Sequence, residues 1–298
     1  MANTVRELSE SEQQARRETE QRLQARMKEI RHKILVLSGK GGVGKSTVAA
    51  NLAVALADEG HIVGLLDVDV HGPSIPTLMA LEGASINPGG EYILPVRARD
   101  RLWVMSIGFL LKSNRDAVIW RGPLKYRLIQ QFLSDVAWGS LDYLVIDSPP
   151  GTGDEPLSVV QLVGRSAAAV IVTTPQELAI SDVRRCVTFC NECKLAIAGI
   201  LENMSGYVCP QCGTMANVFG CGGGQKLAQE MNVPFLGQVP LDPHIVSLGD
   251  RGKAFVSEEA TARSTLAFRE VVANIKRQIV EQQAPEVSVP KKDEALVS

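Results

Sequence analysis

From Lys33 onwards, short apolar runs alternate with stretches long enough to form helices. Almost every position in the runs is apolar or glycine, without polar residues at alternate places, which is typical of parallel strands covered on both faces. The runs cover residues 34–37, 62–66, 144–146, 168–172 and 196–201, with 235–239 as a weaker case. This pattern predicts an α/β fold with a doubly wound, mostly parallel sheet.

The two ends of the chain follow a different pattern. Residues 1–33 hold 14 charged side chains and a narrow apolar stripe of Leu23, Met27 and Ile30, so we expect a charged, exposed helical arm over residues 1–32. Residues 284–298 carry proline and charge without periodicity, and we expect a disordered tail there. The domain between them should span residues 33–283, with a hairpin excursion at 85–101 around Pro-Gly-Gly.

Composition narrows the function classes. With 31 basic and 33 acidic side chains, the net charge is −2, which argues against a protein that coats nucleic acid or membranes. No apolar run approaches the length of a membrane span and the first twenty residues are polar, so we expect a cytoplasmic protein. The six cysteines are then expected to be reduced thiols or metal ligands rather than disulfides.

The strongest chemical motif follows the first predicted strand. SGKGGVGKST opens the helix-like stretch 47–57, which is the context of a phosphate-binding P-loop. Its glycines let backbone N–H groups point at phosphate, and the helix N-terminus adds a favourable dipole. Lys45 is expected to contact the β- and γ-phosphates of ATP and Ser46 to bind Mg²⁺. The residues expected to contact nucleotide are Gly39, Lys40, Gly41, Gly42, Val43, Gly44, Lys45, Ser46 and Thr47.

Lys40 is a second lysine inside the same loop. One triphosphate does not obviously need two lysines from one chain, so Lys40 is predicted to contact phosphate across a subunit interface, as an arginine finger does. The alternative is a solvated loop lysine.

Three aspartates follow predicted strands. Asp67 and Asp69 end the run at 62–66, and Asp147 ends the run at 144–146. Ligands of parallel sheets lie beyond the carboxyl ends of the strands. Asp147 is therefore predicted to hold the Mg²⁺ water shell, Asp69 to position the attacking water, and Asp67 to help order the metal ligands. The alternative for each is a capping or turn aspartate. The Pro- and Gly-containing turn at 149–154 suits a switch loop that senses the γ-phosphate.

A CPQC sequence places Cys209 and Cys212 in a Gly-rich loop at 207–224, where both thiolates could bind one metal. A tetrahedral Zn²⁺ or a [4Fe–4S] cluster needs four ligands, and a homodimer supplies them from two such loops. Zinc held within one chain with the help of Cys221, and an inert or redox-active pair, are the alternatives. Cys186, Cys190 and Cys193 lie on one face of a predicted helix at 181–194 and are expected to be packing residues.

The motifs GKGGVGKST, DVDVHGPSIP, WRGP, DYLVIDSPPGTGD, ENMSGYVCPQC and VPLDP occur in this order. Together they resemble the Mrp/ApbC branch, which includes Nbp-type proteins, of the MinD-type deviant Walker A P-loop ATPases. The resemblance covers residues from about 33 to about 276. It implies a slow, Mg²⁺-dependent ATP hydrolase that carries a [4Fe–4S] cluster across a homodimer, receives it from the assembly machinery and transfers it to apo-proteins.

The resemblance also implies roles for single residues. Lys40 and Lys45 match the two P-loop lysines, and Asn203 lies where related ATPases recognise adenine, as does the loop at 240–242. The switch aspartates match Asp69 and Asp147, and the cluster ligands match Cys209 and Cys212. Alternative functions are a MinD/ParA-like spatial-regulation ATPase, a zinc-bound P-loop ATPase, and an ATP-driven electron donor like the nitrogenase iron protein.

Overall fold

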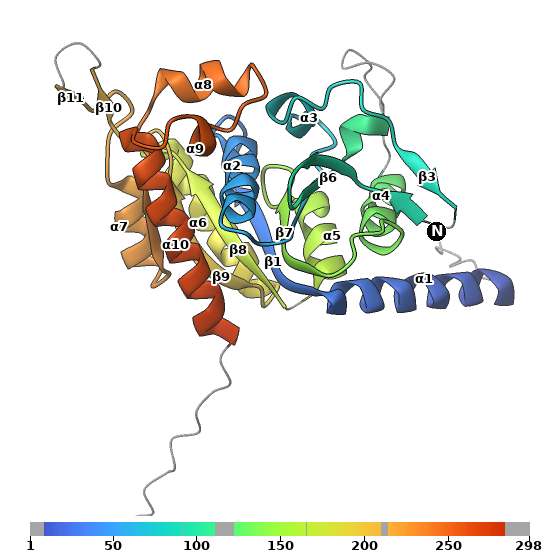
Figure 1. The fold of residues 1–298 in the computed structure, drawn as a ribbon. Helices are drawn as coiled ribbons and strands as arrows, with labels where there is room; N and C mark the ends of the chain where they lie inside the picture. Colours follow the sequence, from blue (N-terminus) through green and yellow to red (C-terminus); the bar gives the residue numbers. More distant parts are fainter. Residues whose placement is uncertain (1–8, 91, 111–121, 165, 210–213, 284–298) are drawn as a thin grey trace, which may run out of the picture.

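An eight-stranded sheet forms the centre of the protein (Figure 1). The computed structural model describes residues 9–90, 92–110, 122–164, 166–209 and 214–283. The strand order is β12-β9-β8-β1-β7-β2-β6-β5, in which only β5 pairs antiparallel with its neighbour. The strands of this sheet are β1 (Ile30–Ser38), β2 (Val63–Asp67), β5 (Val96–Arg99), β6 (Leu102–Ser106), β7 (Leu141–Asp147), β8 (Ala167–Thr173), β9 (Ala196–Glu202) and β12 (Phe235–Gln238).

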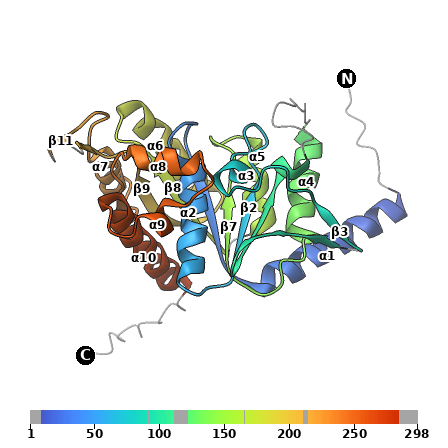
Figure 2. The same ribbon diagram turned by 45° about the horizontal axis from the view of Figure 1, so that its top comes forward.

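Helices cover both faces of the sheet, as a doubly wound fold requires (Figure 2). On one face α2 (Lys45–Asp58) contacts β1, β2 and β7 and lies against α9 (Phe255–Glu258) and α10 (Arg263–Gln283). On the other face α4 (Gly122–Ser134) packs on α5 (Asp154–Val163), and α6 (Glu177–Glu192) packs on α7 (Gly223–Glu230). The two short helices α3 (Ile75–Leu78) and α8 (Pro243–Gly249) lie near the carboxyl edge of the sheet (Figure 1).

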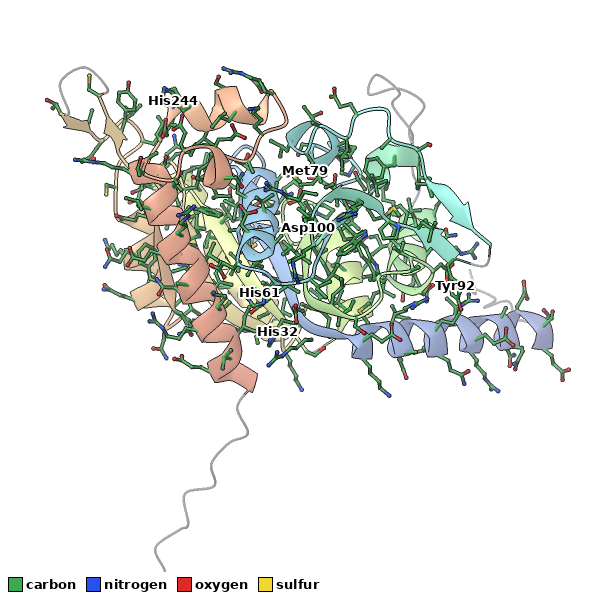
Figure 3. All side chains as sticks on the ribbon, viewed as in Figure 1. His32, His61, Met79, Tyr92, Asp100 and His244 are labelled. Carbon is green, nitrogen blue, oxygen red and sulfur yellow. The ribbon has the colours of Figure 1, made fainter. Side chains whose placement is uncertain are left out.

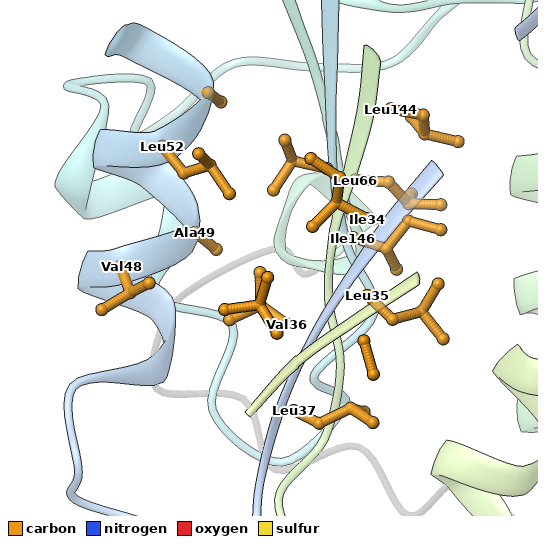
Figure 4. Close-up of a cluster of buried hydrophobic side chains, with 14 of the residues drawn as sticks. Ile34, Leu35, Val36, Leu37, Val48, Ala49, Leu52, Leu66, Leu144 and Ile146 are labelled. Carbon is orange, nitrogen blue, oxygen red and sulfur yellow. The ribbon is translucent and has the colours of Figure 1, made fainter. Parts of the chain in front are cut away.

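The core lies between α2 and the central strands. Figure 4 shows Val48, Ala49 and Leu52 of α2 facing apolar side chains of the sheet. The strand residues labelled there, Ile34, Leu35, Val36, Leu37, Leu66, Leu144 and Ile146, are all fully buried. Alternate side chains of β1 point to opposite faces of the sheet, so Val36 faces α2 whereas Leu35 and Leu37 point away from it. Burial of an apolar side chain of this size contributes about 1.5–3 kcal/mol, so the apolar runs that identified the strands also stabilise them.

Each of the six apolar runs lies within or overlaps a strand of the sheet, which confirms the predicted α/β class. The hairpin expected at 85–101 is present as β3 (Asn87–Gly89) paired with β4 (Tyr92–Leu94), and β5 follows it into the main sheet. Three strands were missed: β6, which pairs in parallel with β2 at Trp103 and its neighbours, and the two-residue strands Tyr207–Val208 and Met215–Ala216 in the segment expected to be a loop. The sequence of β6, LWVMS, is short and lies between basic residues and a Ser–Ile–Gly turn.

The N-terminal arm is a helix, α1 (Glu10–Glu29), but its apolar stripe is not exposed as expected. Leu23 and Met27 are buried and α1 lies against α4. The Lys33 ammonium donates to the carbonyls of Met27 at 2.8 Å and Ile30 at 2.9 Å, so it caps the end of α1 from inside the core. β1 begins at Ile30, three residues before the expected domain boundary.

Histidines lie at both edges of the sheet (Figure 3). Near the amino ends of the strands, His32 and His61 each contact the ring of Tyr143, with centroids 5.0 Å apart. At the carboxyl edge, His244 lies on α8.

No helix in the described part of the chain is both long and apolar enough to span a bilayer. The tail expected at 284–298 lies outside the described residues.

Candidate nucleotide site and cysteine loop

The P-loop connects β1 to α2 at the carboxyl edge of the sheet. Gly42 and Gly44 have φ values of 81° and 84°, a left-handed conformation that glycine adopts without strain. A Cβ atom on Gly44 would lie 2.3 Å from Nδ2 of Asn203. That nitrogen donates to the Val43 carbonyl at 2.9 Å, so the loop is closed tightly by a residue 160 positions away.

Lys45 lies at the centre of a carboxylate cluster. Its Nζ is 2.6 Å from Oδ1 of Asp147 and 3.4 Å from Oδ2 of Asp69. The Ser46 hydroxyl lies 3.3 Å from the same nitrogen. The expected convergence of Asp69 and Asp147 on the P-loop is therefore present, because β1, β2 and β7 are neighbours and end at the same edge.

Asp67 has a supporting position. It is fully buried, accepts hydrogen bonds from the Ser106 hydroxyl at 2.8 Å and from the Asp69 N–H at 3.0 Å, and does not line the cleft. Burial, followed by the charge of Asp147, raises the pKa of Asp67 to about 8. The protonated form of Asp67 is thus favoured far more than in an ordinary aspartate, and its hydrogen bond from the Asp69 N–H fixes the backbone that carries Asp69.

The remaining charges are strongly coupled. Burial raises the pKa of Asp147, and the ammonium of Lys45 opposes that rise without cancelling it. Burial also disfavours the charged form of Lys45, but the neighbouring carboxylates, Asp147 foremost, outweigh it and raise the pKa of Lys45. One ammonium therefore faces more carboxylate charge than it neutralises, which attracts a further cation.

The residues present fit a magnesium ion. Oδ2 of Asp147 is buried and has no hydrogen-bond partner among the described residues, and a buried carboxylate oxygen without a partner is costly. The Ser46 hydroxyl lies beside the same lysine. Hydroxyl and carboxylate oxygens are the ligands that Mg²⁺ prefers.

A cleft of about 830 Å³ opens above this cluster. Its lining includes Lys40, Lys45, Ser46, Thr47 and Asp69. A second cavity of about 170 Å³ adjoins it and shares Gly44, Thr47 and Leu78 with it; it also holds Asn203 and the loop at 240–242. This mainly apolar cavity beside a phosphate loop has the composition of a base-binding pocket. The P-loop residues were expected from their motif, and Asn203 and the loop at 240–242 from the family resemblance; the structure places these two groups in adjoining cavities.

Lys40 reaches the cleft from the P-loop itself. Among the described residues its ammonium forms no ion pair, in contrast to Lys45, although the backbone carbonyl of Lys40 accepts from the Ser38 hydroxyl at 3.0 Å. The two lysines of one loop are thus in different environments. Carboxylates of the same chain pair with Lys45, whereas no carboxylate among the described residues pairs with Lys40.

The turn after Asp147 lies against the P-loop. The Gly151 N–H donates to the Ser38 carbonyl at 2.8 Å. The helix that follows carries Glu155, whose carboxylate binds Lys125 of α4 and accepts a hydrogen bond from His71 Nε2 at 3.0 Å. His71 follows Asp69 closely, so this triad joins the two loops that flank the phosphate cleft. No sequence pattern predicted this triad, because the three residues come from separate segments.

The cysteine loop lies at the same edge of the sheet (Figure 1). It starts with a small hairpin of β10 (Tyr207–Val208) and β11 (Met215–Ala216), and the Cys209 N–H donates to the Thr214 carbonyl at 3.0 Å. Cys209 is half-buried, and Cys212 lies outside the described residues. Cys221 is exposed and its sulfur lies 3.4 Å from the Ser205 hydroxyl. No group of three potential metal ligands occurs among the described residues.

The other cysteines are packing residues, as predicted. Cys186 and Cys190 are fully buried on the inner face of α6, and Cys193 is half-buried at its end. Burial raises the pKa of Cys186 to about 12 and that of Cys190 further, so both remain thiols at neutral pH. The helix begins at Glu177, four residues before the predicted start.

Residues 29–276 match the ParA-type family model described as NUBPL iron-transfer P-loop NTPase. The chain is 54% identical over 250 residues to a cytosolic Fe–S cluster assembly factor NUBP2 homolog of Culex quinquefasciatus, covering 83% of this chain and 97% of the relative. The corresponding Anopheles gambiae protein is 52% identical, with 83% and 96% covered.

Solved structures also resemble the chain. A nucleotide-binding protein of Archaeoglobus fulgidus, in complex with ADP and with Co found by PIXE, is 41% identical with a TM-score of 0.72, covering 84% of this chain and 96% of that one. The cell division ATPase MinD of Pyrococcus furiosus has 24% identity and a TM-score of 0.61, with 83% and 98% covered. The latter similarity concerns the fold alone.

Proposed function

Because the chain belongs to the ParA-type family of NUBPL iron-transfer P-loop NTPases, we propose that it is an ATP-dependent carrier of iron–sulfur clusters. It holds a [4Fe–4S] cluster between two copies of itself and transfers the cluster to apo-proteins. The relatives at 52–54% identity are named as cytosolic Fe–S cluster assembly factors. This agreement supports a cytoplasmic location and contact with the assembly machinery for this chain as well.

The observation that carries the proposal is the position of two sites on one sheet edge. The P-loop follows β1, and the loop with Cys209 follows β9, two strands away in the sheet. Nucleotide and cluster would therefore bind to segments that leave the same rigid scaffold in the same direction. A carrier whose cargo depends on ATP needs this proximity.

The nucleotide chemistry follows from the charges. Lys45 is positioned to exchange part of its interaction with Asp147 for the β- and γ-phosphates, whose charge it neutralises. Ser46 and Asp147 would hold Mg²⁺, which supplies neutralisation of phosphate charge when bound. Asp69 lines the cleft, where its carboxylate would orient the attacking water. Hydrolysis is expected to be slow, because the site is complete only when a second copy supplies Lys40.

Lys40 is proposed to act in the partner's site. Its ammonium has no ion pair in the described chain, and a cation that reaches a transferring phosphoryl group stabilises the transition state. Dimerisation would thus complete both ATP sites at once. The same dimer would bring two cysteine loops together.

The cluster is cargo, and its ligands are proposed to be Cys209 and Cys212 from both copies. Four thiolates are the usual ligands of a [4Fe–4S] cluster. The half-buried position of Cys209 at the outer edge of the sheet suits a cluster that must be delivered. Buried cysteines such as Cys186 are inaccessible and would not exchange cargo.

Of the alternative functions, the spatial-regulation ATPase has weaker support. The MinD protein shares the fold at 24% identity, whereas the iron-transfer family model and the cluster assembly factors match most of the chain. Metal analysis of the purified protein distinguishes the alternative of a zinc-bound ATPase from the cluster carrier.

The test is anaerobic iron, sulfide and zinc analysis with a visible spectrum, on the wild-type protein and on Cys209→Ser and Cys212→Ser. We expect one four-iron cluster per dimer in the wild type and loss of iron in both variants. Cys193→Ser is the matched control, because that thiol is half-buried on another element, and it should keep its iron. Stoichiometric zinc in freshly isolated wild type, or iron retained by both loop variants, would contradict the proposal.

A further inference from the structure

The strand β9 ends on two adjacent residues whose buried side chains hold two different loops. Glu202 is fully buried and Asn203 is 9% exposed. Successive side chains of an extended segment point in opposite directions, so neighbouring residues can reach separate elements. Here one reaches the P-loop and the other reaches the downstream end of the cysteine loop.

On the nucleotide side, the Asn203 side chain forms a hydrogen bond with the P-loop. Its Nδ2 donates to the Val43 carbonyl at 2.9 Å, and its backbone N–H donates to the Thr173 carbonyl at 2.7 Å. Any Cβ on Gly44 would collide with this amide, so the P-loop backbone and the Asn203 side chain are closely packed. A displacement of the P-loop around Val43 must therefore move Asn203 or break this bond.

On the cysteine side, Glu202 acts as the anchor of the loop. Its carboxylate accepts from the N–H groups of Gly222 at 2.8 Å and Gly224 at 2.5 Å, and from the Ser205 hydroxyl at 2.5 Å. A fourth donor, Nε2 of Gln238, lies 3.1 Å away. Hydrogen bonds to a carboxylate are about twice as strong as neutral ones, so this carboxylate fixes the backbone around Cys221.

The arrangement requires a carboxylate rather than an amide. Glu202 has only donors around both of its oxygens, and an ionised carboxylate accepts on both. A glutamine would turn an NH₂ group toward backbone or hydroxyl donors and leave at least one bond unmade. The space is also closed, since a Cβ on Gly224 would lie 3.1 Å from Oε2 of Glu202.

We propose that Glu202 is the positioning residue that couples the nucleotide site to the cysteine loop. It ties the backbone after the CPQC sequence to the strand end whose next residue holds the P-loop. A change at the P-loop on ATP binding is thereby transmitted through Asn203 and Glu202 to residues 221–224 and alters access to Cys209. The inference deepens the proposed carrier function and rests on it.

The test compares Glu202→Gln with the wild type and with Glu270→Gln, which makes the same change at an exposed position on α10. Two rates are measured with and without ATP and Mg²⁺. The first is alkylation of Cys209 in the apo-protein, followed by peptide mass spectrometry. The second is release of the reconstituted cluster to a chelator, followed by its visible absorbance.

In the wild type and in Glu270→Gln we expect ATP to change both rates by about 5-fold or more, the lower end of typical coupling between sites. In Glu202→Gln the ratio with and without ATP should fall below about 2-fold, while ATP still binds. A purely structural role would change both rates equally in the two nucleotide states and leave the ratio intact.

An ATP response in Glu202→Gln equal to that of the wild type overturns the inference, and so does a wild type that binds ATP and cluster without any response. A wild type that holds no cluster instead contradicts the carrier function itself. If Glu202→Gln does not fold, Ser205→Ala removes one donor and leaves the backbone anchor. It should reduce the ATP response, with faster hydrogen exchange at Gly222 and Gly224; an unchanged response there overturns the inference.

Discussion

The nucleotide site and the cysteine loop share one sheet edge but differ in how the chain builds them. Lys45 and Asp147 are buried and form an ion pair 2.6 Å long, and Asp67 is fully buried on the neighbouring strand β2. The half-buried Cys209 belongs to a two-stranded hairpin outside the main sheet. The downstream end of its loop is held to the core by Glu202, through the N–H groups of Gly222 and Gly224.

The contrast has a physical reason. A phosphate site needs charges fixed in a region of low dielectric, where they act strongly and require no rearrangement. A site that receives and releases cargo needs ligands that another protein can reach. Burial fixes the charges of a phosphate site, whereas exposure makes the ligands of a cargo site reachable. One chain can therefore have both only if the two sites are separate and are connected by other residues.

The largest effect is expected at Lys40, the residue that the buried cluster does not use. Lys40→Ala should lower the rate of ATP hydrolysis by about 10³-fold, as loss of an arginine finger does, with ATP affinity changed by less than about 3-fold. Turnover and equilibrium binding of ATP check this. Lys28→Ala, an exposed lysine on α1, is the control. Unchanged turnover in Lys40→Ala would show that the nucleotide site is complete within one chain.

Replacement of Lys45 should weaken ATP binding, whereas replacement of Lys40 should slow turnover and leave binding nearly unchanged. Lys45→Met keeps the length of the side chain but removes the charge from a site only 6% exposed. Truncation of one partner of a buried charged pair costs about 2–5 kcal/mol, so ATP affinity should fall at least about 30-fold. Calorimetric titration with ATP and Mg²⁺ measures it. An affinity close to that of Lys40→Ala would mean that the two lysines are equivalent.

Asp67 predicts a pH dependence of stability. Its pKa is about 8 in the folded protein against 3.8 as the ordinary value, so between these values the folded state binds more protons than the unfolded state. Stability supplied by this group is therefore present below about pH 4 and is lost as pH rises to about 8, by up to ~1.4 kcal/mol per pH unit.

Asp67→Asn keeps the shape of the protonated carboxyl but does not titrate. Its free energy of unfolding should therefore rise relative to wild type between pH 5 and pH 7, measured by urea denaturation without nucleotide. Asp100→Asn, at a carboxyl whose side chain is 82% exposed, serves as control. Parallel pH curves for Asp67→Asn and wild type would refute the elevated pKa.

The smallest expected effects are on the free energy of unfolding, and they distinguish the buried cysteines from Cys209 in the loop. Cys186→Ser places a hydroxyl in a fully buried apolar position and should lower the free energy of unfolding by about 1–3 kcal/mol. Cys209→Ser in the cluster-free protein should change it by less than about 0.5 kcal/mol. Urea denaturation of both variants measures the difference. Equal losses would place Cys209 in the core rather than on a delivery loop.

The sequence predicted those parts of the molecule that depend on local pattern. Apolar runs identified the strands, and the rule for strand ends placed Asp69 and Asp147 beside the P-loop. The role of Glu202 was not predictable, because its partners Gly222 and Gly224 lie 20 and 22 positions away and depend on the path of the intervening loop. The burial of Leu23 and Met27 was missed for a similar reason, since it is supplied by the tertiary contact with α4.

The buried ammonium of Lys33 gives α1 a use beyond packing. It fixes the last turn of a helix about 30 Å long at the amino edge of the sheet, opposite the P-loop and the cysteine loop (Figure 1). A fluorophore attached near Glu10 would lie far from both sites. Because α1 is fixed to the sheet, the dye would move with the sheet as one rigid body. In the proposed dimer, energy transfer between two such dyes would report how far apart the arms of the two copies lie.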